Sequence, residues 1–251
     1  MKYNNIHCVS KFKNQQIKNI TLSRVKSSRK INSSLENICK QKWNEKLTKL
    51  NKTKTKLWDS EVYRFEKIYQ IKNSLIINVS TIPLSIRLMM NNFTEKIQKL
   101  GVDYASLGMF FSCFVLTKDC YFLFAEKSQY FYFDRKFTFI GGILSKTENN
   151  NTSKCNIFNE VKKEMKEEIG ITNQNIDSLN LLGYYKTSNF NFCLLFKIKL
   201  NITLEEALNG FSNRTEQEIE KIIPIHKNNL QNFLLKNMSA KDSIKFSFLK
   251  N

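Results

Sequence analysis

The chain has 251 residues, of which 41% are hydrophobic and 25% are charged. This length and composition suit one large domain or two modest ones with a buried core, and they exclude disorder throughout the chain. The net charge is +18, yet fifteen basic and only two acidic residues fall within residues 1–56. The basicity is therefore an N-terminal property, which could steer polyphosphates or RNA or could simply solvate the surface.

Neither a secretory signal nor a membrane span is expected. Residues 1–20 lack an apolar core, and the apolar run at 109–116 is too short to cross a bilayer. Residues 1–35 contain no Asp or Glu, so a transit peptide remains an alternative to a folded N-terminus. Six cysteines without C-x-x-C pairing fit a reducing compartment, and we expect a cytoplasmic protein without a membrane partner.

Residues 1–102 are expected to form a small α+β lobe that is lysine-rich up to residue 56. Alternating residues indicate strands, apolar residues at helical spacing indicate helices, and Gly101 marks a helix end. In chain order, the pattern predicts a strand at 17–22, a helix at 32–50, a strand pair at 61–71 and 74–82, and an amphipathic helix at 84–100.

Residues 103–251 are expected to form a second domain, with a mixed sheet packed between helices. A strand that ends in Gly141 and Gly142 leads through an Asn-rich loop to a helix that Gly170 closes. The expected elements are a hairpin at 107–117 and 120–128, a strand at 136–142, a helix at 156–169, strands at 179–187 and 190–200, an acidic stretch at 215–225 that extends the sheet, and a helix at 229–235.

Three glutamates of the 156–169 helix share one face. Residues three and four apart lie side by side on a helix, so Glu164, Glu167 and Glu168 repel one another by a few tenths of a kcal/mol per pair. A bound cation would explain that cost, and carboxylate oxygens suit Mg²⁺ or Mn²⁺ rather than zinc. The alternative is an ordinary solvated helix face with interleaved lysines.

Residues 141–171, "GGILSKTENNNTSKCNIFNEVKKEMKEEIGI", resemble the Nudix box. That pattern is Gly, five residues, Glu, seven residues, then Arg-Glu-hydrophobic-x-Glu-Glu-x-Gly-hydrophobic. Gly142 and Glu148 match the first half, and the second half matches except that Lys163 replaces Arg. Fourteen residues, not seven, separate Glu148 from Lys163, and the Asn-rich loop can absorb them at modest entropic cost.

The resemblance implies an α/β/α sandwich and hydrolysis of a nucleoside diphosphate linked to another moiety. It also implies that Glu164, Glu167 and Glu168 ligate Mg²⁺ or Mn²⁺, with the Gly141 carbonyl as a further ligand. Lys163 would anchor the loop by pairing with an acid such as Glu148, without the planar fork of Arg. The general base would be Glu164, Glu167 or a downstream acid, for which the candidates are Glu216, Glu218 and Glu220; a solvated stretch is the alternative for these three.

Substrate contacts are expected near the ends of two strands. Lys127 ends the strand at 120–128, where it could contact a phosphate, and Gly142 lies at the entrance of the loop. Arg64 and Arg87 are further candidates for a phosphate contact. Tyr130, Tyr132 and Phe133 could stack a base or belong to a core strand, and His226 has no partner pattern and is expected to be non-catalytic.

The N-terminal lobe also resembles the lobe that precedes the Nudix domain in UDP-glucose diphosphatases. The residues that carry this resemblance are Trp43, the stretch at 57–68 and the stretch at 100–128. It implies a UDP-sugar or a similar nucleotide as substrate. The alternatives are an RNA-directed pyrophosphohydrolase with a decapping-like activity, suggested by the basic N-terminus, and a non-catalytic nucleotide-binding module, suggested by the stretched loop.

Overall fold

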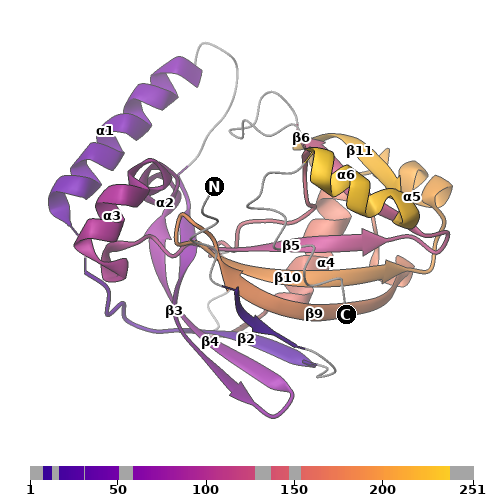
Figure 1. The fold of residues 1–251 in the computed structure, drawn as a ribbon, viewed down its shortest axis with the longest axis horizontal. Helices are drawn as coiled ribbons and strands as arrows, with labels where there is room; N and C mark the ends of the chain where they lie inside the picture. Colours follow the sequence, from indigo (N-terminus) through magenta and orange to yellow (C-terminus); the bar gives the residue numbers. More distant parts are fainter. Residues whose placement is uncertain are drawn as a thin grey trace.

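The protein folds into two β-sheets with helices packed against them, as a computed structural model shows (Figure 1). The structure describes residues 8–12, 17–30, 32–50, 59–127, 137–146 and 154–237. Helices and strands alternate along the chain, which confirms the predicted α+β class. Four short 3₁₀ turns complete the described part: η1 (Asn91–Phe93), η2 (Val102–Tyr104), η3 (Asn173–Asn175) and η4 (Lys227–Asn229).

The larger sheet has seven strands in the order β1-β9-β10-β5-β6-β11, with β7 paired to β6. Strands β10 and β5 run parallel and their other neighbours are antiparallel, so the sheet is mixed, as predicted. Its strands are β1 (Cys8–Lys11), β5 (Met109–Leu116), β6 (Tyr121–Lys127), β7 (Phe137–Thr138), β9 (Ile176–Lys186), β10 (Phe192–Leu200) and β11 (Ile219–His226).

Helices cover both faces of this sheet. Alternate residues of β10 point to opposite faces, so Leu194 lies in one core cluster and Leu195 in another. The first cluster includes Val161 and Met165 of α4 (Ile157–Ile169), and the second includes Leu230 and Leu234 of α6 (Leu230–Asn237). The sheet is thus sandwiched between α4 and α6, as expected.

The smaller sheet has four strands in the order β3-β4-β2-β8. β3 and β4 form the predicted hairpin, and Lys72 at its tip adopts a positive φ of 51°. The strands are β2 (Asn19–Arg24), β3 (Glu61–Ile71), β4 (Ser74–Pro83) and β8 (Lys154–Asn156).

Each sheet includes a strand from the other part of the sequence. β1, near the start of the chain, pairs with β9 in the larger sheet. β8, which directly precedes α4, pairs with β2 in the smaller sheet. The division of the chain into residues 1–102 and 103–251 stays a prediction, and these two pairings tie its halves together.

Helices α1, α2 and α3 lie on the same side of the molecule as the smaller sheet (Figure 1). The Asn32 side chain accepts a hydrogen bond from the Leu35 N–H at 2.9 Å and so caps the start of α1. The helix predicted at 84–100 is broken by η1, where Asn91 and Asn92 have low helix propensity. The helices are α1 (Ser33–Leu50), α2 (Leu84–Met90) and α3 (Thr94–Leu100).

The strand predicted at 136–142 is a regular strand only at β7. Thr138 pairs with Ala125 of β6, and the chain then crosses to β5, where Ile140 pairs with Cys113. The prediction was too long because β5 and β6 diverge, and the segment that fills the gap between them changes partner midway. This crossing delivers the Gly pair to the edge of α4.

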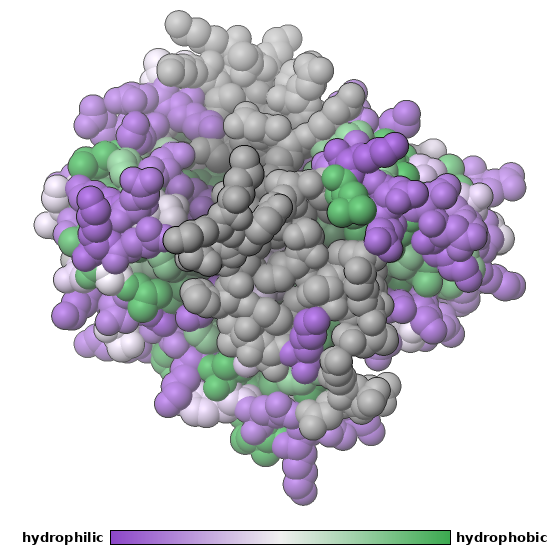
Figure 2. Space-filling model, viewed as in Figure 1, coloured by the Kyte–Doolittle hydropathy of each residue, from purple (hydrophilic) through white to green (hydrophobic). Residues whose placement is uncertain are grey.

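Helix α5 (Leu204–Phe211) was not predicted. It begins in a capping box, in which the Thr203 hydroxyl accepts from the Glu206 N–H at 3.3 Å and the Glu206 carboxylate accepts from the Thr203 N–H at 2.7 Å. Within the described residues, none of the helices has the length and apolar character needed to cross a bilayer. Among the coloured residues on the face shown in Figure 2, hydrophilic ones predominate and hydrophobic ones form small separate patches.

A candidate active site of clustered glutamates

Helix α4 presents the three predicted glutamates beside its buried stripe. Asn156 caps its start, accepting from the Phe158 N–H at 3.1 Å, and Gly170 ends it with a left-handed φ of 71°. Because Val161, Met165 and Ile169 face the core, Glu168 next to them is only 2% exposed. Glu164 and Glu167 are half-buried on the same side of the helix.

The loop between α5 and β11 brings two more carboxylates to α4. The Glu216 N–H donates to the Glu167 carbonyl at 3.0 Å, which docks the loop on the end of the helix. The Arg214 guanidinium donates to the Phe211 and Ile219 carbonyls at 3.0 and 3.2 Å and so closes the loop. Glu218 lies inside this loop, whereas Glu220 is exposed at a bulge of β11.

Lys127 lies between the two groups of carboxylates. It ends β6 opposite Ile219 of β11, so the pairing of these strands sets its position. Its ammonium forms an ion pair with Glu218 and lies 4.0 Å from a Glu168 oxygen. The other Glu168 oxygen, Oε2, is buried and has no hydrogen-bond partner among the described residues. Burying a carboxylate oxygen without a hydrogen-bond partner destabilises the folded state, so such an atom is expected to bind a ligand or to have a functional role.

The Gly pair approaches the same carboxylates. The Gly142 carbonyl accepts from the Phe111 N–H at 2.9 Å, and a Cβ at Gly142 would lie 2.9 Å from Cδ of Glu164. Gly141 has a φ of 153°, and a Cβ there would lie 2.3 Å from the Phe111 carbonyl oxygen. Both glycines are therefore required by close approach. The role of the Gly141 carbonyl as a ligand stays a prediction.

The carboxyl groups at this site have raised pKa values. Burial raises the pKa of Glu164 to about 7, with a further rise from Glu216 and Glu167 that Lys163 opposes. Burial raises the pKa of Glu168 to about 8, where Lys127 opposes and Glu218 adds to the rise. Partial burial, with Glu167 and Glu218 nearby, also raises the pKa of Glu216. The site thus gathers more negative charge than its lysines neutralise.

The structure brings together some predicted residues and leaves others apart. Lys163 is half-exposed and pairs with Glu167 at 3.6 Å, one turn along α4. Glu220 is not among the charges that raise the pKa of Glu164, Glu168 or Glu216. The His226 ring packs edge-on against the Tyr121 ring, with 5.2 Å between the ring centroids, and this contact suits a structural role. Glu148, Tyr130, Tyr132 and Phe133 lie outside the described residues.

The donor atoms of the residues at this site are of the type that a divalent cation such as Mg²⁺ prefers. Hard oxygen ligands are available from five carboxylates, those of Glu164, Glu167, Glu168, Glu216 and Glu218. Oε2 of Glu168 is buried and has no hydrogen-bond partner among the described residues. In the described part of the chain, no three His, Cys, Asp or Glu side chains are already gathered closely enough to hold a metal ion. Binding a cation therefore requires these side chains to turn toward one another.

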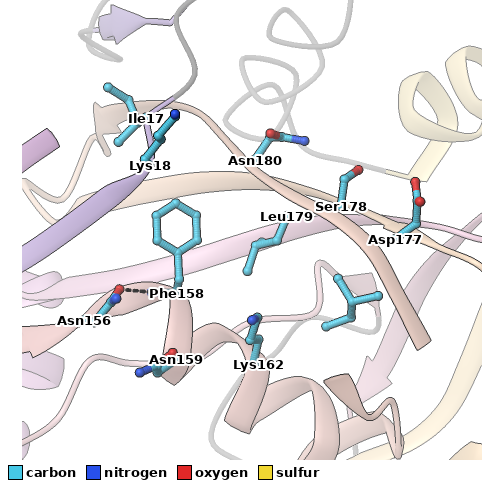
Figure 3. A pocket seen from close by; sticks show the side chains of 11 residues that line it. Ile17, Lys18, Asn156, Phe158, Asn159, Lys162, Asp177, Ser178, Leu179 and Asn180 are labelled. Atoms are coloured by element: carbon cyan, nitrogen blue, oxygen red, sulfur yellow. Dashed lines mark hydrogen bonds between the residues drawn. The ribbon is translucent and has the colours of Figure 1, made fainter. Parts of the chain in front are cut away.

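A separate cavity of about 540 Å³ lies on another side of α4. Figure 3 shows its lining, with Phe158 and Lys162 from α4 and Leu179 and Asn180 from β9. Lys162 is two residues from Glu164 and so points away from the glutamate face of the helix. This cavity contains none of the predicted site residues.

Solved structures to which the chain is similar include Nudix hydrolases. A NUDIX hydrolase from Nitrosomonas europaea is 11% identical with a TM-score of 0.35, and the match covers 57% of this chain and 87% of that one. DR0079 from Deinococcus radiodurans is 12% identical, with a TM-score of 0.39 and coverage of 57% and 82%. Tm1382, named as a candidate Nudix hydrolase, is 11% identical, with a TM-score of 0.39 and coverage of 76% and 98%.

Both the sequence identity and the TM-score are low for all three structures. No family model matches the sequence. No curated protein matches it either.

Proposed function

We propose that the chain is a metal-dependent hydrolase that cleaves the pyrophosphate bond of a nucleoside diphosphate linked to another moiety. The observation that carries this proposal is the convergence of carboxylates at one place: Glu168 and Glu218 lie next to Lys127. Glu164, beside Gly142, is close enough to both glutamates to act on their charges. Neighbouring carboxylates that raise one another's pKa destabilise a fold unless a cation binds among them, and such a group is expected where function requires it.

Each residue of the cluster has a part in this chemistry. Water must attack a phosphorus atom that is shielded by anionic oxygens, so the site has to neutralise charge and orient the water. Mg²⁺ or Mn²⁺ held by Glu164, Glu167 and Glu168 would supply the charge neutralisation. Lys127 lies where it can pair with a phosphate oxygen once Glu218 turns away. Glu164, Glu167, Glu216 and Glu218 are the candidates to take the proton from water.

The two glycines and Lys163 would shape this site without taking part in proton transfer. Gly142 leaves room for a phosphate to approach the backbone next to Glu164. Lys163 holds the Glu167 carboxylate at 3.6 Å and can thereby orient it. We therefore assign Lys163 a positioning role in place of the loop-anchoring role of an Arg.

A UDP-sugar or a related nucleotide is the substrate class that we propose. Support comes from the resemblance of the N-terminal part to the lobe of UDP-glucose diphosphatases. A small-molecule substrate is favoured over RNA because the cluster of site residues lies in the part of the chain with little excess positive charge. A cytoplasmic setting, where nucleotide sugars and Mg²⁺ are both present, belongs to this proposal.

Turnover by the purified chain tests the proposal. The chain is incubated with Mg²⁺ and a panel of UDP-sugars, ADP-ribose, NADH, dinucleoside polyphosphates and capped RNA, and release of phosphate products is followed. We expect turnover of a UDP-sugar or a related nucleotide. Glu168→Gln should lower kcat on the order of 10²-fold, because it removes a group that stabilises charge in the transition state. Glu205→Gln, an exposed residue of α5, is the matched control and should retain wild-type turnover.

Two results would contradict the proposed activity or mechanism, and a third would contradict only the proposed substrate class. Binding of these nucleotides without turnover would identify a non-catalytic nucleotide-binding module. A kcat for Glu168→Gln within about threefold of wild type would show that this glutamate has no part in catalysis. Turnover of capped RNA alone would retain the reaction and overturn the substrate class.

A further inference from the structure

Arg87 is a buried cation that has neither a hydrogen-bond nor an ion-pair partner for its side chain within the described residues. Its side chain projects from α2 and is 5% exposed. The guanidinium Nε is buried without a hydrogen-bond partner, and among the described residues the Arg87 side chain forms neither a hydrogen bond nor an ion pair. Burying an unpaired charge costs several kcal/mol, so a protein rarely retains one without a use for it.

Arg64 provides the contrast, because it is equally buried but has partners. It is 4% exposed, and its Nη2 donates to the Ala105 carbonyl at 2.7 Å and the Asp103 carbonyl at 3.4 Å. Burial lowers the pKa of both guanidinium groups to about 10. Carboxylates of Glu66 and Asp103 oppose this shift for Arg64, whereas burial alone acts on Arg87. The Arg64 Nε is also buried without a hydrogen-bond partner, so the difference lies in the rest of the group. Arg64 has the Nη2 hydrogen bonds and nearby carboxylates, which Arg87 lacks among the described residues.

Packing holds the Arg87 side chain in place. A Cβ at Gly108 would lie 2.4 Å from Nε and 2.6 Å from Cδ of Arg87, so the side chain lies directly on this glycine. Its Cζ is 6.0 Å from the centroid of the Phe110 ring. Glycine at position 108 makes room for the arginine, and the orientation of the guanidinium is therefore set before any ligand arrives.

The Arg87 group lies at the same end of the larger sheet as the glutamate cluster. Gly108 immediately precedes β5, and three residues later the Phe111 N–H donates to the Gly142 carbonyl beside Glu164. Three strand residues span about 10 Å. Lys127 is toward the same end, because β6 runs antiparallel to β5 and pairs with it only at Val115 and Leu116, the far end of β5. An extended nucleotide could reach from the glutamates to α2.

We propose that Arg87 is an anion-binding residue that takes a phosphate oxygen of the nucleotide substrate. The identification of the ligand as a nucleotide rests on the proposed function. The observation that the Arg87 guanidinium is buried and unpaired is independent of it. Phosphate is the favoured anion because the planar fork of Arg matches two of its oxygens and charge-assisted hydrogen bonds would satisfy the donors that are now unpartnered. Asn91, one turn further along the chain, accepts from Asn191 at 3.0 Å and gives this region a polar border.

The test is binding of inorganic pyrophosphate in EDTA at constant ionic strength, measured by calorimetry and by thermal shift. Wild type should bind, and Arg87→Met should weaken binding at least tenfold. The thermal midpoint of ligand-free Arg87→Met should equal or exceed that of wild type, because a buried uncompensated charge is removed. Lys99→Met, which removes an exposed charge of α3, is the matched control and should change the affinity less than twofold.

The inference is overturned if wild type does not bind pyrophosphate, or if Arg87→Met binds equally well. A lower midpoint with unchanged affinity would show that Arg87 only stabilises the fold. Should Arg87→Met not fold, Arg87→Lys decides: weakening by threefold or more supports the inference, and unchanged affinity overturns it. Turnover that depends on Glu168 is measured separately, so a failure here leaves the hydrolase proposal standing, and the converse also holds.

Discussion

The two adjacent glycines at the site are required for different physical reasons. At Gly142 an added methyl group meets the end of a flexible side chain, the Glu164 carboxyl at 2.9 Å. At Gly141 it meets backbone, the Phe111 carbonyl oxygen at 2.3 Å, and the φ of 153° is one that L-residues rarely adopt. A side chain can move aside, whereas a paired strand cannot.

Substituting these glycines should therefore separate activity from stability. We expect Gly142→Ala to displace Glu164 and to lower kcat about tenfold or more, with a change in unfolding free energy below about 1 kcal/mol. Gly141→Ala should destabilise by on the order of 2 kcal/mol or more. Urea denaturation and steady-state kinetics measure both effects. Equal loss of stability in the two variants would contradict this assignment.

Glu164 should also carry a stability cost. It is half-buried beside Glu167 and Glu216, and their charges act against its ionised form. In EDTA at pH 8, Glu164→Gln should raise the thermal midpoint by about 2–4 °C, because about 1 kcal/mol of repulsion and desolvation is relieved. Glu205→Gln, outside the cluster, should leave the midpoint unchanged. A lower midpoint for Glu164→Gln would indicate that this carboxylate stabilises the fold.

At the level of single residues, the sequence was informative where the site is local. Glu164, Glu167 and Glu168 lie within one helical turn, so helical spacing alone placed them on one face. Arg214 could not be recognised, because its role depends on the Phe211 and Ile219 carbonyls, which only the loop conformation brings together. Choosing between Arg64 and Arg87 likewise required knowing which buried guanidinium has partners.

Among the elements, the contact between the ends of α4 and α5 positions the second group of carboxylates. A Cβ at Gly170 would lie 2.0 Å from the Gly210 carbonyl oxygen, so the two helix ends meet backbone to backbone. The loop that carries Glu216 and Glu218 leaves α5 just beyond this contact. The distance between the two carboxylate groups thus depends on two glycines that are not themselves part of the site.

Alanine at these two glycines should give unequal results. Gly170 needs a left-handed φ of 71° and has no room, so Gly170→Ala should destabilise by on the order of 2 kcal/mol or more and weaken any Mg²⁺-induced rise in thermal midpoint. At Gly210 a Cβ would be 3.3 Å from the Gly170 carbonyl oxygen and the backbone is helical, so Gly210→Ala should stay within about 1 kcal/mol of wild type. Denaturation with and without Mg²⁺ tests this, and a neutral Gly170→Ala would refute the close contact.

The strongly periodic elements were predicted well, and the short ones were not. The spacing of apolar residues indicated α1, α4 and the β3–β4 hairpin to within a residue or two. β8 has only three residues and forms because it pairs with the free edge of β2. No local sequence pattern predicts this long-range pairing. β7 was overextended because partner exchange between β6 and β5 is a tertiary event. The capping box before α5 was readable in the sequence, from Thr203 and Glu206 three residues apart, and was missed.

For the molecule as a whole, the exchange of β1 and β8 between the sheets predicts cooperative unfolding. Loss of the smaller sheet would release β8, which directly precedes α4, and loss of the larger sheet would release β1. We expect urea unfolding followed by tryptophan fluorescence, which reports on Trp43 and Trp58 of the N-terminal part, to coincide with unfolding followed by circular dichroism. Two separated transitions would show that the parts unfold independently.

The pairing of β1 with β9 has a consequence for how the protein is made. Cys8 lies opposite Tyr185, so most of the chain must leave the ribosome before the first strand finds its partner. At about 5–20 residues per second, that interval is on the order of ten seconds or more. β2 likewise waits for β8. During synthesis the N-terminal strands therefore have unpaired edges, and we expect the nascent chain to depend on chaperones more than a protein whose strands pair with near neighbours.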